Sequence, residues 1–242
     1  VGPRFTAEMA DAGKKLRLVQ VAGAGTDKIE VNALPPGTVV ANTFHHEDAI
    51  AEYIVASTVL LRRGILRQDA ALRRGEWASP AHNRTEPWVS GLAGATVGFV
   101  GFGHIGARTW ELFKAFRARG VSVTRRGNVD AGQGLDWAGT VSDLGKLLEI
   151  ADVVVVCAPL TPETTGIIGK AELAAMRPSA VLVNVGRGPL VDQQALYTAL
   201  ANKTIGGAVI DVWYDYPSSG NTGAPSALPF NELSNLLMTP HY

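Results

Sequence analysis

The chain has 242 residues, with 22 basic and 22 acidic side chains, five histidines, 46% hydrophobic residues and a single cysteine. This composition is typical of a soluble globular protein, with room for one large domain or two smaller ones. Because the formal charge is zero, the sequence offers no electrostatic basis for binding nucleic acid or an anionic membrane surface. No apolar run approaches the ~18 residues of a spanning helix, and the lone Cys157 fits a reducing, cytoplasmic compartment.

Short apolar, β-branched runs alternate along the chain with longer amphipathic stretches. The expected strands are Leu16–Val21, Thr38–Ala41, Ala95–Val100, Val121–Thr124, Asp152–Cys157, Ala180–Val185, Gly206–Ile210 and Leu236–Thr239. The expected helices cover residues 46–64, 104–118, 141–149, 170–176 and 190–201. This alternation predicts an α/β fold of right-handed βαβ units around a parallel sheet. Residues 74–94 and 214–229, rich in Pro and Gly, are expected to be surface connections.

A glycine motif lies between an expected strand and an expected helix. Gly101, Gly103 and Gly106 form a Gly-x-Gly-x-x-Gly pattern directly after Val100. In this context the first glycine permits a tight turn, the second lets the backbone approach a pyrophosphate, and the third lets helix and strand pack closely. The motif predicts dinucleotide binding, although glycines also end strands for purely structural reasons.

The position about 20 residues further on distinguishes the two nicotinamide dinucleotides. An acid there accepts hydrogen bonds from the adenosine ribose in NAD-binding proteins. Here the chain has Thr124, Arg125 and Arg126, and no carboxylate until Asp130. Arginines pair with a 2′-phosphate, so we expect NADP to be preferred over NAD. The alternative is that both arginines are simply exposed to solvent.

Three further segments place polar residues after expected strands: Asn184–Pro189, Asp211–Pro217 and Thr239–His241. In open α/β sheets, sites form at these carboxyl ends. With the glycine motif they form an ordered set that resembles the D-isomer-specific 2-hydroxyacid dehydrogenases over nearly the whole chain. The other members of the set are Gly23–Asp27, Ala51-Glu52 and Pro159–Thr164.

The resemblance implies two domains and a reaction. It implies a partial flavodoxin-like substrate domain at 1–42 and a Rossmann domain with a doubly wound parallel sheet at 43–242. The implied activity is hydride transfer between NAD(P)(H) and a small 2-keto or D-2-hydroxy acid, such as glyoxylate or hydroxypyruvate. Relatives dimerise through the Rossmann domain, so we expect a homodimer, with Tyr53–Leu61 as a contributor. Because the chain starts without Met and stops just after an apolar run, we expect both ends to be cut.

By the same resemblance, Arg187 and His241 are the catalytic residues. A forked guanidinium suits the planar carboxylate and carbonyl of a 2-keto acid, and a histidine donates the proton that the developing alkoxide needs near neutral pH. The backbone of Ala24 and Gly25 corresponds to the loop that binds the substrate carboxylate. The implied cofactor contacts beyond the glycines are His104, Ile105, Ala158, Pro159, Thr164, Val185, Gly186 and Asp211.

The sequence departs from the family pattern at Tyr216. Relatives have a glutamate there that pairs with the histidine and raises its pKa, which a neutral phenol does far less. Asp215 is a possible substitute if the loop is offset by one residue. Because formate dehydrogenases of the same superfamily also have a neutral residue here, oxidation of formate or phosphite is one alternative. A nucleotide-sensing module without turnover is another, although such a sensor needs neither Arg187 nor His241.

A second departure is His46, where many relatives have an asparagine that faces the substrate. We expect His46 to be a substrate contact. A metal site at this segment is not expected, because neighbouring side chains diverge and no spaced third ligand is evident.

Overall fold

The computed structural model describes residues 4–241, which form two compact units, Val1–Asp48 (unit 1) and Ala49–Tyr242 (unit 2). Unit 1 contains the helix α1 (Ala7–Ala12), the 3-10 turn η1 (Val31–Ala33) and two strands, β1 (Leu18–Gln20) and β2 (Val39–Ala41). The two strands pair in parallel, and Val19, Val21 and Ile29 form the small core beneath them. Unit 1 therefore shows the parallel pairing that the alternation of strand and helix predicts.

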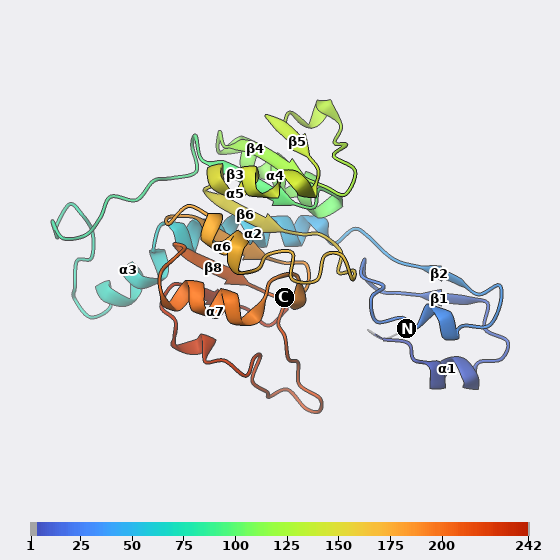
Figure 1. Cartoon of the computed structure of the whole chain (residues 1–242). Coiled ribbons are helices and arrows are strands. Elements are labelled where there is room, and N and C mark those ends of the chain that lie inside the picture. Colours follow the sequence, from blue (N-terminus) through green and yellow to red (C-terminus); the bar gives the residue numbers. More distant parts are fainter. Residues whose placement is uncertain (1–3, 242) are drawn as a thin grey trace. The chain divides into compact units, whose positions relative to one another are not determined.

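Unit 2 is built on a sheet of seven parallel strands in the order β5-β4-β3-β6-β7-β8-β9 (Figure 1). The strands are β3 (Thr96–Val100), β4 (Arg119–Val123), β5 (Trp137–Gly139), β6 (Val153–Val156), β7 (Val181–Asn184), β8 (Gly207–Ile210) and β9 (Leu236–Met238). The order reverses between β3 and β6, which are neighbours in the sheet although β4 and β5 lie between them in the chain. This is the switch point of a doubly wound fold, so the predicted fold class is confirmed.

Helices cover both faces of this sheet. They are α2 (Glu47–Arg62), α4 (His104–Ala115), α5 (Leu144–Ile150), α6 (Lys170–Ala175) and α7 (Gln193–Ala201). A further helix, α3 (Ile65–Leu72), follows α2 and lies apart from the sheet (Figure 1). Short 3-10 turns lie at η2 (Ala131–Gln133), η3 (Val141–Asp143), η4 (Gly188–Leu190) and η5 (Phe230–Glu232).

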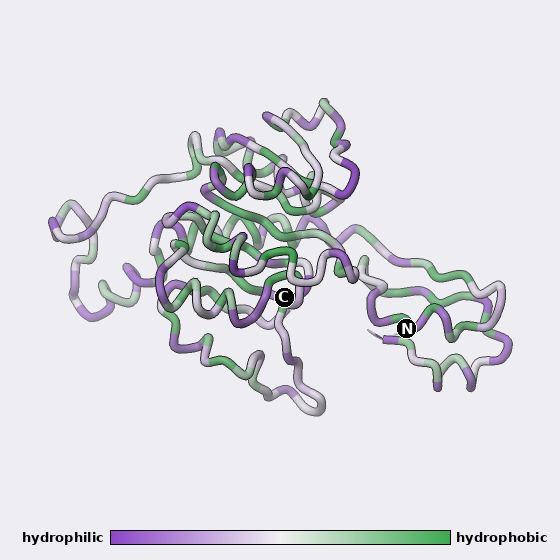
Figure 2. Tube along the Cα trace, viewed as in Figure 1, coloured by the Kyte–Doolittle hydropathy of each residue, from purple (hydrophilic) through white to green (hydrophobic). Residues whose placement is uncertain are grey.

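Strand β6 shows how the two faces are used. Val154 and Val156 pack with residues of α5, α6 and α7, whereas Val153 and Val155 pack with residues of α2 and α4. All four valines are fully buried, as a strand covered on both sides requires. Figure 2 shows the central strands as hydrophobic, and the core of unit 2 thus consists of two layers separated by the sheet.

Three elements were not predicted from the sequence: α1, α3 and β5. Strand β5 has three residues, all half-buried at the edge of the sheet, so it lacks the apolar run that marks the other strands. Helix α4 ends at Ala115, earlier than predicted, because Phe116 closes the last turn and Arg117 has a left-handed backbone with φ of 59°.

The segment after α2 carries the two most exposed aromatic side chains among the described residues of unit 2. Helix α3 and the connection that follows it run out from the sheet (Figure 1), and Trp77 and Trp88 are 60% and 85% exposed. By contrast, Ile54 and Val55 of the predicted dimer contact Tyr53–Leu61 are buried in the core of their own unit. Within residues 4–241, no helix combines the length and the apolar character that crossing a membrane requires.

Candidate active site

The predicted site residues of unit 2 all follow the carboxyl ends of strands in one parallel sheet. The glycine motif follows β3, Thr124 follows β4, Ala158 follows β6, Val185 follows β7 and Asp211 follows β8. Thr239, Pro240 and His241 follow β9. Because these strands are parallel, their carboxyl ends lie along a single edge of the sheet, where α/β proteins bind ligands.

The glycine loop is shaped by backbone contacts that exclude side chains. Gly101 has φ of 90°, and a Cβ there would lie 2.7 Å from the Cα and backbone nitrogen of Ala158. A Cβ on Gly103, in contrast, would meet no protein atom within 4 Å, although Gly103 directly precedes α4. The helix therefore begins with exposed backbone and open space, which is the arrangement that accepts a pyrophosphate at a helix N-terminus. These residues fit a dinucleotide.

Cys157 contacts the backbone of the glycine loop. Its thiol donates a hydrogen bond to the carbonyl oxygen of Gly101 at 3.1 Å, and burial raises its pKa to about 12. A thiol that stays protonated is a poor nucleophile, so Cys157 has a structural role here.

Two loops beside the glycines place the remaining predicted cofactor contacts. Arg125 and Arg126 are exposed just beyond β4, and the Thr124 hydroxyl accepts a hydrogen bond from the backbone of Gly127 at 3.0 Å. The Thr164 hydroxyl donates to the carbonyl oxygen of Pro159 at 2.8 Å, which closes the loop after β6. A hydrogen bond with Thr161 lowers the pKa of Glu163 in this loop, and the positive charge of Arg125 adds a smaller effect in the same direction.

Asn184 shapes the loop that carries Arg187. Its buried side chain accepts a hydrogen bond from the backbone of Gly186 at 3.2 Å and donates to the carbonyl oxygen of Arg187 at 3.0 Å. The Arg187 guanidinium is half-buried and donates to the carbonyl oxygen of Gly186 at 2.8 Å. The chain therefore turns back on itself at the end of β7 and holds a guanidinium at the sheet edge.

His241 and Tyr216 are brought together, as the sequence hypothesis requires. The Tyr216 hydroxyl lies 3.0 Å from Nδ1 of His241, and the backbone N–H of Trp213 donates to the same hydroxyl at 3.1 Å. The exposed ring of Tyr216 thus provides a hydrogen-bond partner for the imidazole. The backbone N–H of Asp215 donates to the carbonyl oxygen of Pro225 at 3.0 Å, so it is Tyr216, rather than Asp215, that contacts the imidazole here.

A partly buried hydrogen-bonded group joins the ends of β8 and β9 to helix α2. The Thr239 hydroxyl donates to Oδ1 of Asp211 at 2.6 Å and lies 2.6 Å from the Tyr53 hydroxyl. The indole N–H of Trp213 donates to the carbonyl oxygen of Thr239 at 2.8 Å. The sequence pattern assigns Tyr53 only to the predicted dimer contact, and it marks Asn184 and Thr239 only as the first residues of their polar segments.

Unit 1 contains the predicted substrate loop. Asn42 donates to the carbonyl oxygen of Ala24 at 2.9 Å, and the backbone N–H of Thr43 donates to that of Gly23 at 3.1 Å. The segments that follow β1 and β2 thus hold each other, with Gly25 exposed. His46 is half-buried and directly precedes α2.

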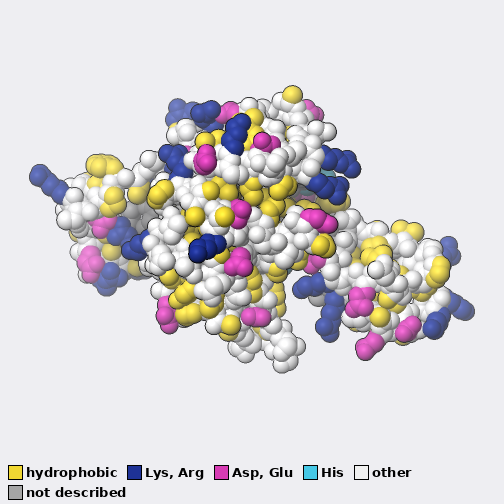
Figure 3. Space-filling view, viewed as in Figure 1, with side chains coloured by type: hydrophobic (Ala, Val, Ile, Leu, Met, Phe, Trp, Pro, Cys, Tyr) yellow, Lys and Arg dark blue, Asp and Glu magenta, His cyan; other side chains and the backbone are white. Residues whose placement is uncertain are grey.

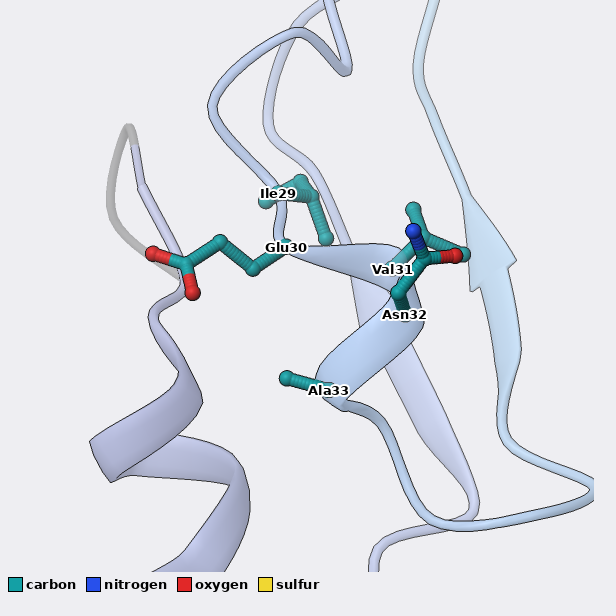
Figure 4. Close-up of a pocket in the computed structure, with 5 residues that line it drawn as sticks. All are labelled: Ile29, Glu30, Val31, Asn32 and Ala33. Atoms are coloured by element: carbon teal, nitrogen blue, oxygen red, sulfur yellow. The ribbon is translucent and has the colours of Figure 1, made fainter.

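Each unit has a hollow on its surface. One is lined by Ile29–Ala33 in unit 1, where Figure 4 shows the Glu30 carboxylate pointing away from Val31 and Asn32. Another lies in unit 2 beside Arg62, whose guanidinium donates to the carbonyl oxygen of Asp152 at the opposite, amino edge. Within residues 4–241, no group of three or more His, Cys, Asp or Glu side chains could hold a metal ion.

The fold and the open helix N-terminus after Gly103 define a dinucleotide-binding α/β protein. The sequence profile of the D-isomer specific 2-hydroxyacid dehydrogenase NAD binding domain matches residues 55–242. The chain therefore belongs to the D-isomer specific 2-hydroxyacid dehydrogenase family, which confirms the resemblance seen in its motifs.

Individual relatives are similar over nearly the whole chain. A glyoxylate reductase from Thermofilum pendens is 32% identical over 98% of this chain and 68% of its own length. A glycerate dehydrogenase from Methylorubrum extorquens is 34% identical over 93% of this chain and 68% of its own length. Across these and other curated relatives that it matches, the chain spans from 43% to 68% of their length.

The fold is also similar to that of solved structures. The structure of an acyclic imino acid reductase (Bsp5) in complex with NADPH and D-Arg has a TM-score of 0.83 and 28% sequence identity. The similarity covers 98% of this chain and 72% of that chain.

Proposed function

We propose that this chain binds NADP(H) or NAD(H) and reduces a small 2-keto acid to the D-2-hydroxy acid, or catalyses the reverse oxidation. The observation that carries the proposal is the His241–Tyr216 hydrogen bond at the same sheet edge as the glycine loop. A dinucleotide fold explains cofactor binding alone, whereas a held histidine at the end of β9 supplies the proton that reduction of a ketone requires. Family membership supports the same reaction class.

The geometry defines how His241 is prepared for proton transfer. Because the Tyr216 oxygen already accepts the N–H of Trp213, its own O–H is available to Nδ1 of a neutral His241. That tautomer carries its proton on Nε2. When the imidazole is protonated, the same phenol oxygen accepts the Nδ1–H, so Tyr216 serves both protonation states.

Arg187 provides the anion-binding group of the proposed site. Its guanidinium pairs with the substrate carboxylate and the adjacent carbonyl oxygen, which orients the carbonyl carbon for attack. The nicotinamide cofactor, when bound, supplies the hydride, and the residues of this chain supply orientation and the proton. We assign Ala24 and Gly25 to the substrate carboxylate and His46 to the remainder of the substrate.

The proposed cofactor is NADP in preference to NAD. Support comes from the two exposed arginines, Arg125 and Arg126, directly after β4, because folds of this class bind the adenosine ribose beside the end of that strand. The similar solved structure of an acyclic imino acid reductase contains NADPH. The proposed contacts to the nicotinamide side are Ala158, Pro159, Thr164, Val185, Gly186 and Asp211.

We also propose a homodimer in the cytoplasm. The exposed apolar residues of α3 and the following segment, Ile65, Leu66, Leu72, Trp77 and Trp88, support a contact with a second copy. Light scattering tests this part directly, and a monomer would contradict it.

The reaction is tested by absorbance at 340 nm, with NADPH and NADH offered separately against glyoxylate, hydroxypyruvate and larger 2-keto acids. We expect NADPH to be oxidised faster than NADH with at least one small keto acid. Reduction of NADP⁺ by formate or phosphite, with no keto acid turned over, would contradict the proposal. NADPH binding without turnover of any substrate would also contradict it and favour a nucleotide sensor.

A further inference from the structure

Thr239 makes four hydrogen bonds within unit 2: its backbone N–H donates to the carbonyl oxygen of Ile210 in β8 at 3.1 Å, and three further bonds come from other parts of the unit. The Tyr53 hydroxyl reaches it from α2, the Asp211 carboxylate from the end of β8, and the Trp213 indole from the loop after β8. The bonds through its side chain are both 2.6 Å long, and the one to its carbonyl oxygen is 2.8 Å long. Tyr53 and Thr239 are 186 residues apart in the chain.

The chemistry of the three groups fixes the direction of the hydrogen bonds. An ionised carboxylate only accepts, so the single hydroxyl hydrogen of Thr239 is donated to Asp211. The Thr239 oxygen must then accept from Tyr53, and the phenol is the donor. The result is an ordered chain from Tyr53 through Thr239 to Asp211, in which each bond polarises the next.

Burial of Asp211 and Tyr53 stabilises this chain of hydrogen bonds. Asp211 is 6% exposed, so the alternative of bonding to bulk water is largely closed to it. Burial raises the pKa of Tyr53 to about 12, which keeps its phenol protonated and able to donate at neutral pH.

The residue that depends on this anchor is His241. Its backbone has φ of 66°, in the left-handed region that non-glycine residues adopt only when neighbouring contacts hold them there. Pro240, with a fixed φ, is the sole residue between it and Thr239. Immobilising Thr239 therefore limits where the imidazole can lie.

We propose that Tyr53 is a positioning residue that acts through the Thr239 hydroxyl to orient the Asp211 carboxylate and to fix the segment carrying His241. This inference rests on the proposed dehydrogenase function, in which Asp211 lies at the cofactor and His241 at the substrate. It assigns α2 a part in catalysis beyond its packing against the sheet. The hydrogen-bonded chain also links the cofactor to the proton donor, because the Thr239 hydroxyl contacts Asp211 and Thr239 anchors the segment that carries His241.

A double-mutant cycle on kcat tests the proposal. We expect Tyr53→Phe to lower kcat with a small keto acid about 3- to 10-fold, the effect of one hydrogen bond. Thr239→Val removes both side-chain bonds and should lower kcat at least about 10-fold, whereas Thr239→Ser, which keeps the hydroxyl, should stay within about 2-fold of wild type. The double variant Tyr53→Phe/Thr239→Val should be no slower than Thr239→Val alone, because the Thr239 hydroxyl to which Tyr53 donates is already absent.

The control is Tyr197→Phe, which makes the same phenol-to-phenyl change on α7, where the ring packs against Phe230 at 5.5 Å. It should leave kcat unchanged. The proposal is overturned if Tyr53→Phe behaves like this control, or if the effects of the Tyr53 and Thr239 variants multiply in the double variant. A purely structural role for Tyr53 would lower Tm in Tyr53→Phe without this coupling in kcat.

The same cycle distinguishes this inference from the proposed function. If wild type turns over no keto acid, the proposed function fails, and the cycle is measured on the Kd for NADPH by tryptophan fluorescence. Coupling between Tyr53 and Thr239 in that Kd would support the hydrogen-bonded chain at Asp211. Independent effects on that Kd would overturn it.

Discussion

The two sides of the sheet edge are built in different ways. The cofactor side consists of the loops after β3 and β4. Its shape depends on two glycines: Gly101 has no room for a side chain, and Gly103 leaves open space where a side chain would lie. On the reaction side, the loops after β7, β8 and β9, the arrangement depends on side chains that hydrogen-bond across the unit, such as Tyr216 with His241. In the proposed site, the cofactor loop is therefore defined by backbone shape, whereas His241 is positioned by pairs of side chains far apart in sequence.

The charges follow the same division. The exposed arginines at 125 and 126 belong to the cofactor side, whereas the half-buried Arg187 lies on the reaction side within a loop closed by Asn184. On the face of unit 2 seen in Figure 3, basic and acidic side chains are interspersed, in keeping with a chain of zero formal charge. Charge is thus expected to act locally at each side of the site.

Among the groups proposed to bind substrate or cofactor, the largest effect is expected on the reaction side, at Arg187. Arg187→Lys keeps the charge but loses the fork that pairs with a carboxylate, so kcat/KM for the keto acid should fall about 10- to 100-fold while the Kd for NADPH is unchanged. The matched control is Arg177→Lys at the amino edge, where the guanidinium donates to Asp152 at 3.1 Å. Equal losses of kcat/KM in both variants, or no loss in Arg187→Lys, would contradict a specific role for Arg187 in binding the substrate.

A pair of glycine variants tests the cofactor side. Gly103→Ala should leave Tm unchanged but weaken NADPH binding about 10-fold, because the new Cβ occupies space that the protein itself leaves open. Gly101→Ala should lower the free energy of unfolding by about 1–3 kcal/mol, since φ of 90° is strained for alanine and the Cβ overlaps Ala158. Isothermal calorimetry and thermal unfolding separate the two effects. If Gly103→Ala binds NADPH as tightly as wild type, the pyrophosphate lies elsewhere.

Cofactor preference gives an effect of similar size, but one that distinguishes NADPH from NADH. Replacing Arg125 and Arg126 together by alanine should raise the Kd for NADPH about 10-fold and change the Kd for NADH by less than about 2-fold. The control is Arg84→Ala, which removes an exposed charge from the connection after α3. The preference for NADP is wrong if both cofactors lose affinity equally.

The smallest expected effect is a change in pH dependence at Tyr216. A carboxylate beside Nδ1 favours the imidazolium, so Tyr216→Glu should move the pH at which keto acid reduction is half-maximal upward by about one unit. Tyr216→Phe, which removes the hydroxyl, should instead lower the rate without that upward shift. Rate profiles between pH 5 and 9 give the answer, and an identical midpoint in Tyr216→Glu and wild type would show that this side chain does not tune His241.

The cofactor side and the reaction side also differ in how well they could be predicted from the sequence. The sheet and the glycine loop were predictable because apolar runs such as Val153–Val156 and the glycine spacing are local signals. Arg187 and His241 could be named through the family resemblance, since each follows an expected strand.

The hydrogen-bonded chain of Tyr53, Thr239 and Asp211 could not be predicted. Tyr53 lies in an amphipathic helix where an aromatic residue indicates packing, and its partner is 186 residues away. Pairing of this kind depends on tertiary structure alone, as does the short edge strand β5, which the sheet stabilises more than its own sequence does.

The central claim is that the glycine loop and His241 serve one reaction, and stopped-flow absorbance at 340 nm on wild type and His241→Gln tests it most directly. Both proteins should bind NADPH with the same Kd to within about 2-fold, because the cofactor side is intact in each. On mixing with glyoxylate or hydroxypyruvate, wild type should oxidise NADPH, and His241→Gln should do so about 10²- to 10⁴-fold more slowly. Oxidation at the wild-type rate in His241→Gln would contradict the account.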